Sequence, residues 1–220
     1  MNPSSSSAFD PEQSYQLYLD ALLKGDHHRC REIFEQWLES TDTLRSLYDD
    51  LVRHSLYEVG ELWEQGKISV ATEHMATAIS ESLLNLTYPK LFATPRKNRS
   101  AIISCLSGEH HRIGAKMVAD LFELNGWRGY FLGSNTPFDD LKSLVAEKRP
   151  DALALSAATD PNLDRAISAA SEVHTEFPGL AILVGGRALH QVDRDRLEVL
   201  PGVRFLMNTA ELENWIAEQN

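Results

Sequence analysis

The chain has 220 residues and a net charge of −11, from 32 acidic and 21 basic side chains. This length is enough for one large domain or for two small ones that each have a core. The negative charge argues against direct binding to DNA or RNA, which needs a basic face. No apolar run could span a bilayer, and the serine-rich N-terminus lacks the pattern of a signal peptide. We therefore expect a cytoplasmic protein that contacts neither nucleic acid nor membrane.

The first part of the chain carries apolar side chains at helical spacing. Ile33, Phe34 and Trp37 illustrate the intervals of three and four positions that form one face of an amphipathic helix. Short turns separate the helical segments, so neighbouring helices should run antiparallel. Residues 8–94 are therefore predicted to form a four-helix bundle, with helices at 11–24, 27–39, 42–65 and 70–91.

The pattern changes after Pro95, where short apolar runs alternate with amphipathic segments. This alternation is typical of an α/β fold with a parallel sheet. We predict a flavodoxin-like (Rossmann-type) five-stranded domain over residues 100–220. The expected strands are 101–106, 129–132, 152–155, 181–184 and 203–206. The expected helices are 113–125, 138–148, 162–176, 189–199 and a last one from residue 210.

Chemically useful residues fall where three of the predicted strands end. Ligands of such sheets bind beyond the carboxyl ends of the strands. In the loop after the first strand, His111 can coordinate a metal while Glu109 accepts a hydrogen bond from the other ring nitrogen. Gly114 would let the backbone pass close to a bulky group. Ser156, Gly185 and Gly186 end the third and fourth strands.

Each of these residues also has an ordinary structural explanation. A glycine pair at a strand end either makes room for a flat ligand or simply forms a tight turn. A serine such as Ser156 often ends a strand. Other kinds of site fit less well, because the first strand is followed by no phosphate-binding glycine motif and carries no acidic pair for magnesium. Cys30 and Cys105 lie in apolar segments without histidines at zinc-ligand spacing, so we expect buried free thiols.

Glu109, His111 and Gly114, then Ser156 and the pair Gly185-Gly186, resemble the cobalamin-binding domain of methionine synthase, mutases and corrinoid methyl carriers. The resemblance implies that His111 replaces the nucleotide base as the lower ligand of cobalt. It also implies that the displaced dimethylbenzimidazole tail enters a slot lined by Ser156 and the glycines. Glu109 stands where many members have aspartate, and Ala158 stands where leucine is expected, which leaves a smaller wall around the tail.

The helical part resembles the cap of CarH-type cobalamin-dependent photoreceptors. The similarity lies in Trp63, followed after nine residues by Glu73 and His74. It implies that these three side chains surround an adenosyl group on the upper face of the corrin. An indole suits stacking on a nucleoside, and the polar pair suits its ribose hydroxyls. Without the second domain, Trp63 would be expected in the bundle core and Glu73 would merely favour a helix N-terminus.

Two departures from the photoreceptors limit what the resemblance implies. Only about ten residues precede the first predicted helix, so we expect no DNA-binding domain and a signal passed to a protein partner such as a transcription factor. Glu64 stands where photoreceptors have the histidine that ligates cobalt after illumination. Water, hydroxide, His54 or His74 would then fill the upper position.

The sequence thus predicts a cobalamin-binding, light-sensing regulatory protein that signals through protein contacts after photolysis of the cobalt–carbon bond. Adenosylcobalamin is the favoured form, with methylcobalamin and hydroxocobalamin as alternatives. The protein is not expected to be an enzyme. The alternative is a corrinoid methyl-carrier subunit of a methyltransferase system, and a homo-oligomer remains open in either case.

Overall fold

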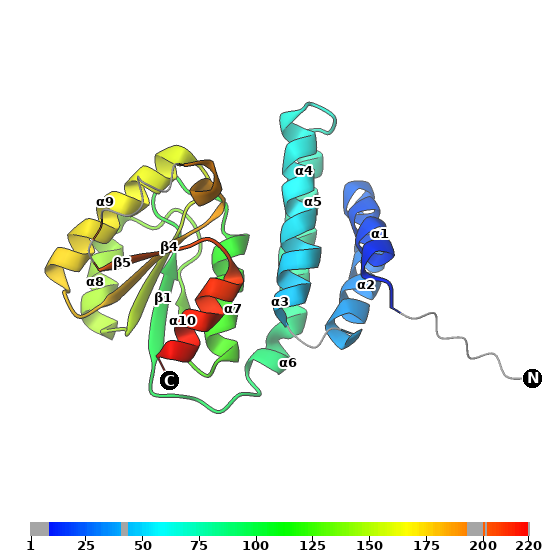
Figure 1. Cartoon of the computed structure of the whole chain (residues 1–220). Coiled ribbons are helices and arrows are strands. Elements are labelled where there is room, and N and C mark those ends of the chain that lie inside the picture. The colour runs from blue at the N-terminus through cyan, green and yellow to red at the C-terminus, as the bar shows by residue number, and fades with distance from the viewer. Residues whose placement is uncertain (1–8, 41–43, 193–199, 201, 220) are drawn as a thin grey trace, which may run out of the picture. The chain divides into compact units, whose positions relative to one another are not determined.

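The computed structural model describes residues 9–40, 44–192, 200 and 202–219. It divides the chain into two compact units, Met1–Pro89 and Lys90–Asn220. The first is helical and the second is an α/β unit (Figure 1). Among the described residues, no helix is both long and apolar enough to cross a bilayer.

The first unit packs its helices around large apolar and aromatic side chains. Tyr18, Leu22, Phe34 and Trp37 of its first two helices are at most 1% exposed. Asp10 caps the first helix by accepting from the Glu12 N–H at 3.1 Å. The elements are α1 (Pro11–Lys24), α2 (His27–Ser40), α3 (Leu44–Ser46), η1 (Leu47–Arg53), α4 (His54–Glu64), α5 (Val70–Leu84), η2 (Asn85–Thr87) and α6 (Tyr88–Leu91).

The predicted helix 42–65 is helical from Leu44 to Glu64, but its middle, η1, is a π-helix. Its buried residues come in adjacent pairs, Leu47 with Tyr48 and Leu51 with Val52, all 0% exposed. A wider i→i+5 turn brings both members of each pair to the core side. The predicted start at residues 42 and 43 lies outside the described residues. The predicted helix 70–91 is likewise interrupted, by the short 3₁₀ turn η2.

A tight turn joins α4 to α5. The Gly66 N–H donates to the Trp63 carbonyl and the Lys67 N–H to the Leu62 carbonyl, both at 2.9 Å. Gly66 has φ +68°, so this is a Schellman ending. The Ser69 hydroxyl oxygen then caps α5 by accepting from the Thr72 N–H at 3.1 Å. The two helices therefore form an antiparallel hairpin (Figure 1).

The second unit is built on a parallel sheet of order β2-β1-β3-β4-β5. The predicted flavodoxin-like winding is confirmed, and the strands agree with the predicted ones to within two residues at each end. The order reverses direction between β1 and β3, where open α/β sheets bind their ligands. The strands are β1 (Ser100–Ser104), β2 (Arg128–Phe131), β3 (Ala152–Ser156), β4 (Ala181–Gly185) and β5 (Val203–Leu206).

Helices cover both faces of this sheet. On one face, α8 (Phe138–Lys148) and α9 (Asp160–Glu176) bury an aliphatic cluster that includes Ile102 and Leu153 (Figure 1). On the other lie α7 (Ile113–Leu124) and α10 (Thr209–Glu218). The predicted helix 189–199 falls mostly outside the described residues, and its start belongs to a 3₁₀ turn, η3 (Arg187–Gln191).

Candidate functional site

The loop between β1 and α7 holds a buried carboxylate beside an exposed imidazole. The Glu109 side chain is 1% exposed, whereas that of His111 is 66% exposed. One Glu109 oxygen, Oε1, lies 2.6 Å from His111 Nδ1 and 2.9 Å from the His111 backbone nitrogen. A carboxylate only accepts, so Nδ1 must donate the proton. This leaves Nε2 as the nitrogen suited to coordinating a metal.

The second oxygen of Glu109 joins this loop to the loop after β3. Glu109 Oε2 accepts from the Ala158 N–H at 2.8 Å and from Asn162 Nδ2 at 2.9 Å. Burial on its own would raise the pKa of the Glu109 carboxyl. The hydrogen bonds from the His111 side chain and from the Ala158 and His111 N–H groups outweigh burial and lower the pKa to about 2. Glu109 is therefore a fixed negative charge at neutral pH.

The loop is also held from the β2 side. The Gly108 N–H donates to Asn135 Oδ1, and the Asn135 N–H donates to the Glu109 carbonyl at 3.0 Å. Asn135 has φ +58° and Gly108 has φ +86°, so both occupy the left-handed region, which asparagine and glycine tolerate best. Hydrogen bonds from the β2 and β3 loops thus determine where Glu109 and His111 lie.

Sequence reasoning missed two side chains of this network, Asn162 and Arg165. Asn162, 8% exposed in the first turn of α9, also approaches the Gly108 carbonyl at 3.3 Å. Arg165, one turn further on, donates to Asn162 Oδ1 at 2.6 Å. An asparagine as the first residue of a predicted helix was the available signal, but such residues more often serve as local caps.

Cys105 and Ser156 lie beside this loop. The Cys105 thiol is 3.7 Å from the His111 carbonyl oxygen. Burial, followed by the charge of Glu109, raises the pKa of Cys105 to about 12, against a smaller opposing effect of a hydrogen bond with Ser156. Both cysteines are free and buried, as predicted. A thiol held protonated is a poor metal ligand.

The predicted glycines have different surroundings. A Cβ on Gly114, in the first turn of α7, would meet no atom within 4 Å. A Cβ on Gly185 would meet only the Leu206 carbonyl oxygen, at 3.4 Å. Gly186 has φ +117°, and its Cβ would lie 2.1 Å from the Ala157 carbonyl oxygen. The fold itself therefore requires glycine at position 186, whereas Gly114 borders open space.

Trp63, Glu73 and His74 lie on the α4–α5 hairpin of the first unit. Trp63 is in the last turn of α4 and is 45% exposed, so it is not a core residue of the bundle. Glu73 Oε2 lies 2.5 Å from His74 Nδ1, and Glu73 Oε1 accepts from the Thr77 hydroxyl at 2.9 Å. The short turn brings the last turn of α4 and the start of α5 to one end of the hairpin.

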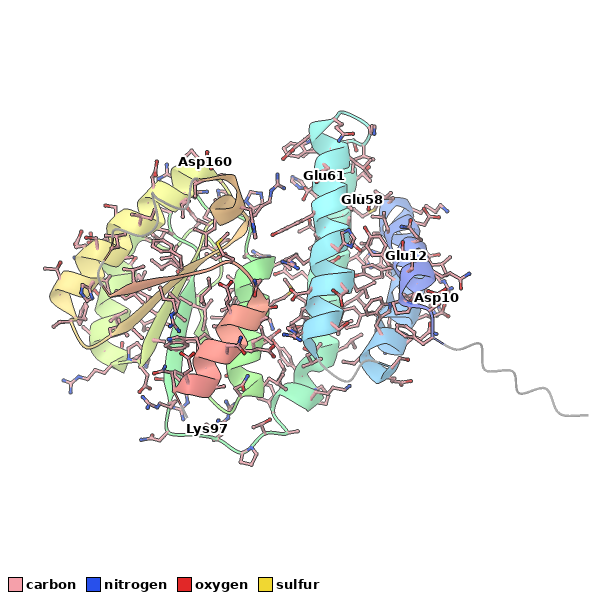
Figure 2. All side chains as sticks on the ribbon, in the orientation of Figure 1. Asp10, Glu12, Glu58, Glu61, Lys97 and Asp160 are labelled. Carbon is pink, nitrogen blue, oxygen red and sulfur yellow. The ribbon has the colours of Figure 1, made fainter. Side chains whose placement is uncertain are left out.

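The bundle also contains a group of carboxylates around Tyr15. Figure 2 shows Glu12 on α1 and Glu58 and Glu61 on α4. The Tyr15 hydroxyl donates to Glu58, and its ring stacks on that of His54 with centroids 4.5 Å apart. Burial, then the hydrogen bond to Glu58, raises the pKa of Tyr15. The hydrogen bond and the ring stacking of Tyr15 therefore join α1 to α4.

Both parts of the chain match models of known protein families. Residues 99–211 match a family model described as B12 binding domain, and residues 15–87 match a second model with the same description. The chain belongs to the B12-binding family. Cobalamin is therefore its cofactor, and the predicted resemblance is confirmed.

Two curated relatives cover much of the chain. The HTH-type transcriptional repressor CarH of Myxococcus xanthus is 29% identical over 185 residues, which is 82% of this chain and 60% of CarH. Trimethylamine corrinoid protein 1 of Methanosarcina acetivorans is 23% identical over 141 residues, 63% of this chain and 65% of that protein. The chain thus spans less than two thirds of each relative.

A solved structure has the same fold. The monomethylamine corrinoid protein of Methanosarcina barkeri superposes with a TM-score of 0.80, covering 96% of this chain and 100% of that one. At 16% identity this likeness shows the fold alone.

Proposed function

We propose that this B12-binding protein is a cytoplasmic light sensor that signals through contacts with a protein partner, such as a transcription factor. The observation that carries the cofactor side of the proposal is the Glu109–His111 pair: an exposed imidazole whose Nδ1 is bound to a buried carboxylate. Such a carboxylate fixes the tautomer and makes the other nitrogen a better ligand. The regulatory side is supported by the similarity to CarH.

The residues at the carboxyl edge of the sheet are suited to the lower face of cobalamin. His111 would present Nε2 to cobalt, with Glu109 holding the ring in place. The open space at Gly114 would accommodate the corrin edge. Ser156, Gly185 and Gly186 would line the slot for the nucleotide tail. Gly185 has no side chain that would project into this slot. When bound, an alkylcobalamin supplies a cobalt–carbon bond that light can break.

In this proposal Trp63, Glu73 and His74 of the hairpin face the upper side of the corrin ring. Trp63, 45% exposed at the end of α4, offers a flat apolar surface on which a nucleoside could stack. Glu73 and His74 would bind the ribose hydroxyls of an adenosyl group, which favours adenosylcobalamin over methylcobalamin and hydroxocobalamin. Loss of the adenosyl group on illumination would leave Trp63, Glu73 and His74 without it, and a change in the packing of the hairpin would then alter the surface offered to the partner.

A corrinoid methyl carrier of a methyltransferase system is the second candidate function. It is supported by the similarity to trimethylamine corrinoid protein 1. In that case His111 would hold cobalt in the same way, and the hairpin would shield a methyl group. A methyl group makes no use of the Glu73–His74 pair, and this favours the light sensor.

Electron paramagnetic resonance tests the lower ligand. Cobalt(II) cobalamin bound to protein with ¹⁵N-labelled histidine should show a two-line nitrogen splitting, since ¹⁵N has spin one half. His111→Ala should remove it and weaken binding at least tenfold. A three-line splitting in the labelled wild-type protein would mean that a ¹⁴N atom of the cofactor's own base stays on cobalt, and the assignment would be wrong.

The relative affinity for two cofactor forms separates the candidate functions. A light sensor should bind adenosylcobalamin at least tenfold more tightly than methylcobalamin, and Trp63→Ala should abolish this preference. His27→Ala is a suitable control, because His27 begins α2 and has no proposed role in cofactor binding. Equal affinities in the wild-type protein would favour the methyl carrier.

A further inference from the structure

The Arg165 side chain reaches from α9 onto the loop that carries His111. Its Nη1 lies 2.6 Å from Asn162 Oδ1 and 3.4 Å from the Ser107 carbonyl oxygen. It also lies only 2.6 Å from the position that a Cβ on Gly108 would occupy. Gly108 thus leaves room for the guanidinium group against the loop backbone.

These contacts determine which way the Asn162 amide faces. A guanidinium group only donates hydrogen bonds, so the amide oxygen must face Arg165. The NH₂ group then faces Glu109 Oε2, at 2.9 Å, and the Gly108 carbonyl, at 3.3 Å. Both of these are acceptors only. All three neighbours therefore require the same amide orientation, and Arg165 is the one that binds the oxygen.

We propose that Arg165 is a positioning residue for the lower ligand of cobalamin. It acts through three successive contacts: Arg165 orients Asn162, Asn162 holds Glu109, and Glu109 holds His111. This inference rests on the proposed function, because it takes His111 as the ligand. Arg165 itself touches neither the imidazole nor, in this proposal, the cofactor.

Loss of Arg165 removes the donor that binds the amide oxygen, so that only Glu109 and the Gly108 carbonyl still hold Asn162 in this orientation. An Asn162 side chain without this contact is fixed less firmly, and its hydrogen bond to Glu109 weakens. Glu109 would then be held less well, and so would His111. Changing a group that supports a metal ligand typically weakens metal binding by about 10- to 100-fold. Because Arg165 acts on the imidazole through two other side chains, we expect the lower end, about tenfold.

A double-mutant cycle tests the chain of action. Cobalamin affinity is measured by equilibrium dialysis for the wild-type protein, Arg165→Met, His111→Ala and the double variant. Methionine keeps much of the apolar stem but cannot donate. Arg165→Met should weaken binding about tenfold in the wild-type background and by less than twofold when His111 is already alanine. Arg165→Lys, which can still donate to the amide oxygen, should recover part of the affinity.

Lys142→Met is the matched control. Lys142 of α8 pairs with Glu172 and Glu176 at the far end of α9, at 2.7 and 3.5 Å. The Lys142→Met substitution therefore removes a cation that pairs with α9 but does not contact Asn162. It should leave the cobalamin affinity unchanged. Thermal unfolding of each cofactor-free variant identifies any loss of fold.

Two other outcomes would refute the inference, and a third would refute the proposed function. An equal loss in both backgrounds would mean that Arg165 acts on the fold or on the cofactor directly, and the inference would be wrong. No loss for Arg165→Met in a protein that does depend on His111 would also refute it. If His111→Ala leaves affinity unchanged, the proposed function itself fails, whatever Arg165 does.

Discussion

Replacing Glu109 with glutamine should destabilise the α/β unit even without cofactor. The carboxylate accepts four hydrogen bonds, two on each oxygen. A glutamine NH₂ group in place of either oxygen would face two donors. In one orientation the donors of Ala158 and Asn162 lose their acceptor; in the other the His111 N–H does, while the imidazole can recover a bond by changing its tautomer.

Two arguments give similar magnitudes for Glu109→Gln. Leaving a buried donor without an acceptor costs about 1–3 kcal/mol, so two cost about 3 kcal/mol when one recovers part of its bonding. The same hydrogen bonds hold the pKa of Glu109 at about 2, below its ordinary value of 4.5, which gives a second figure. At about 1.4 kcal/mol per pKa unit, this corresponds to about 3 kcal/mol of stability at pH 7.

The same pKa shift predicts how the effect depends on pH. Because the folded pKa is lowered, the stabilisation is fully present above pH 4.5 and is lost as the pH falls toward 2. Urea unfolding of the cofactor-free protein should show a difference between wild type and Glu109→Gln of about 3 kcal/mol at pH 7 and about 1 kcal/mol at pH 3.

Hydrogen exchange at the amides of Ile102 and Leu153 would report the second unit separately. Glu172→Gln, an exposed carboxylate on α9, should change stability by less than about 0.5 kcal/mol. A cost below about 1 kcal/mol for Glu109→Gln at pH 7, or one independent of pH, would refute the reasoning.

Three further substitutions test particular features. Gly186→Ala should cost about 4 kcal/mol, from the positive φ and the contact with Ala157, and a thermal shift under about 3 °C would contradict this. Trp63→Ala should change the unfolding free energy of the cofactor-free protein by less than about 1 kcal/mol, because the indole is 45% exposed; a larger loss in urea would make it a core residue. Ser69→Ala should cost about 1 kcal/mol through the lost cap of α5, measured by urea unfolding followed by circular dichroism, and an unchanged midpoint would exclude that role.

The sheet could be predicted because burial sets its pattern directly. Strands covered on both faces become continuous apolar runs, as in Ile102 and Ile103 of β1, which are at most 1% exposed. Alternation with helices then requires a parallel sheet, whose carboxyl ends lie on one edge. The position of the Glu109–His111 loop beside the β3 loop follows from that arrangement alone.

The Glu109–His111 hydrogen bond was predicted, but the hydrogen bonds that reach this loop from other elements could not be. They depend on left-handed backbone at Gly108 and Asn135, which sets the loop path, and on an amide that reaches Glu109 from a different element. Asn162 and Arg165 look in sequence like an ordinary helix start. The π-helix η1 was equally hidden, since paired apolar residues also occur in regular helices.

For Gly186 and Trp63 the sequence left two interpretations open, and the structure bears on each of them differently. Gly186 is required by its positive φ and by the close approach of the Ala157 backbone, a structural reason that holds whether or not a ligand is near. Trp63 continues an apolar stripe in sequence, yet it is 45% exposed because α4 ends there, beyond the packed part of the bundle. Its role on the upper face of cobalamin stays a prediction.

The most direct test of the light-sensing account is a spectrum of the protein reconstituted with adenosylcobalamin in darkness, recorded before and after green light. Sedimentation of the same samples would report assembly. The account predicts a histidine-bound spectrum in the dark that converts on illumination, together with a change in assembly or in affinity for a partner. Photolysis with no change in either property would contradict signalling by light and favour methyl transfer.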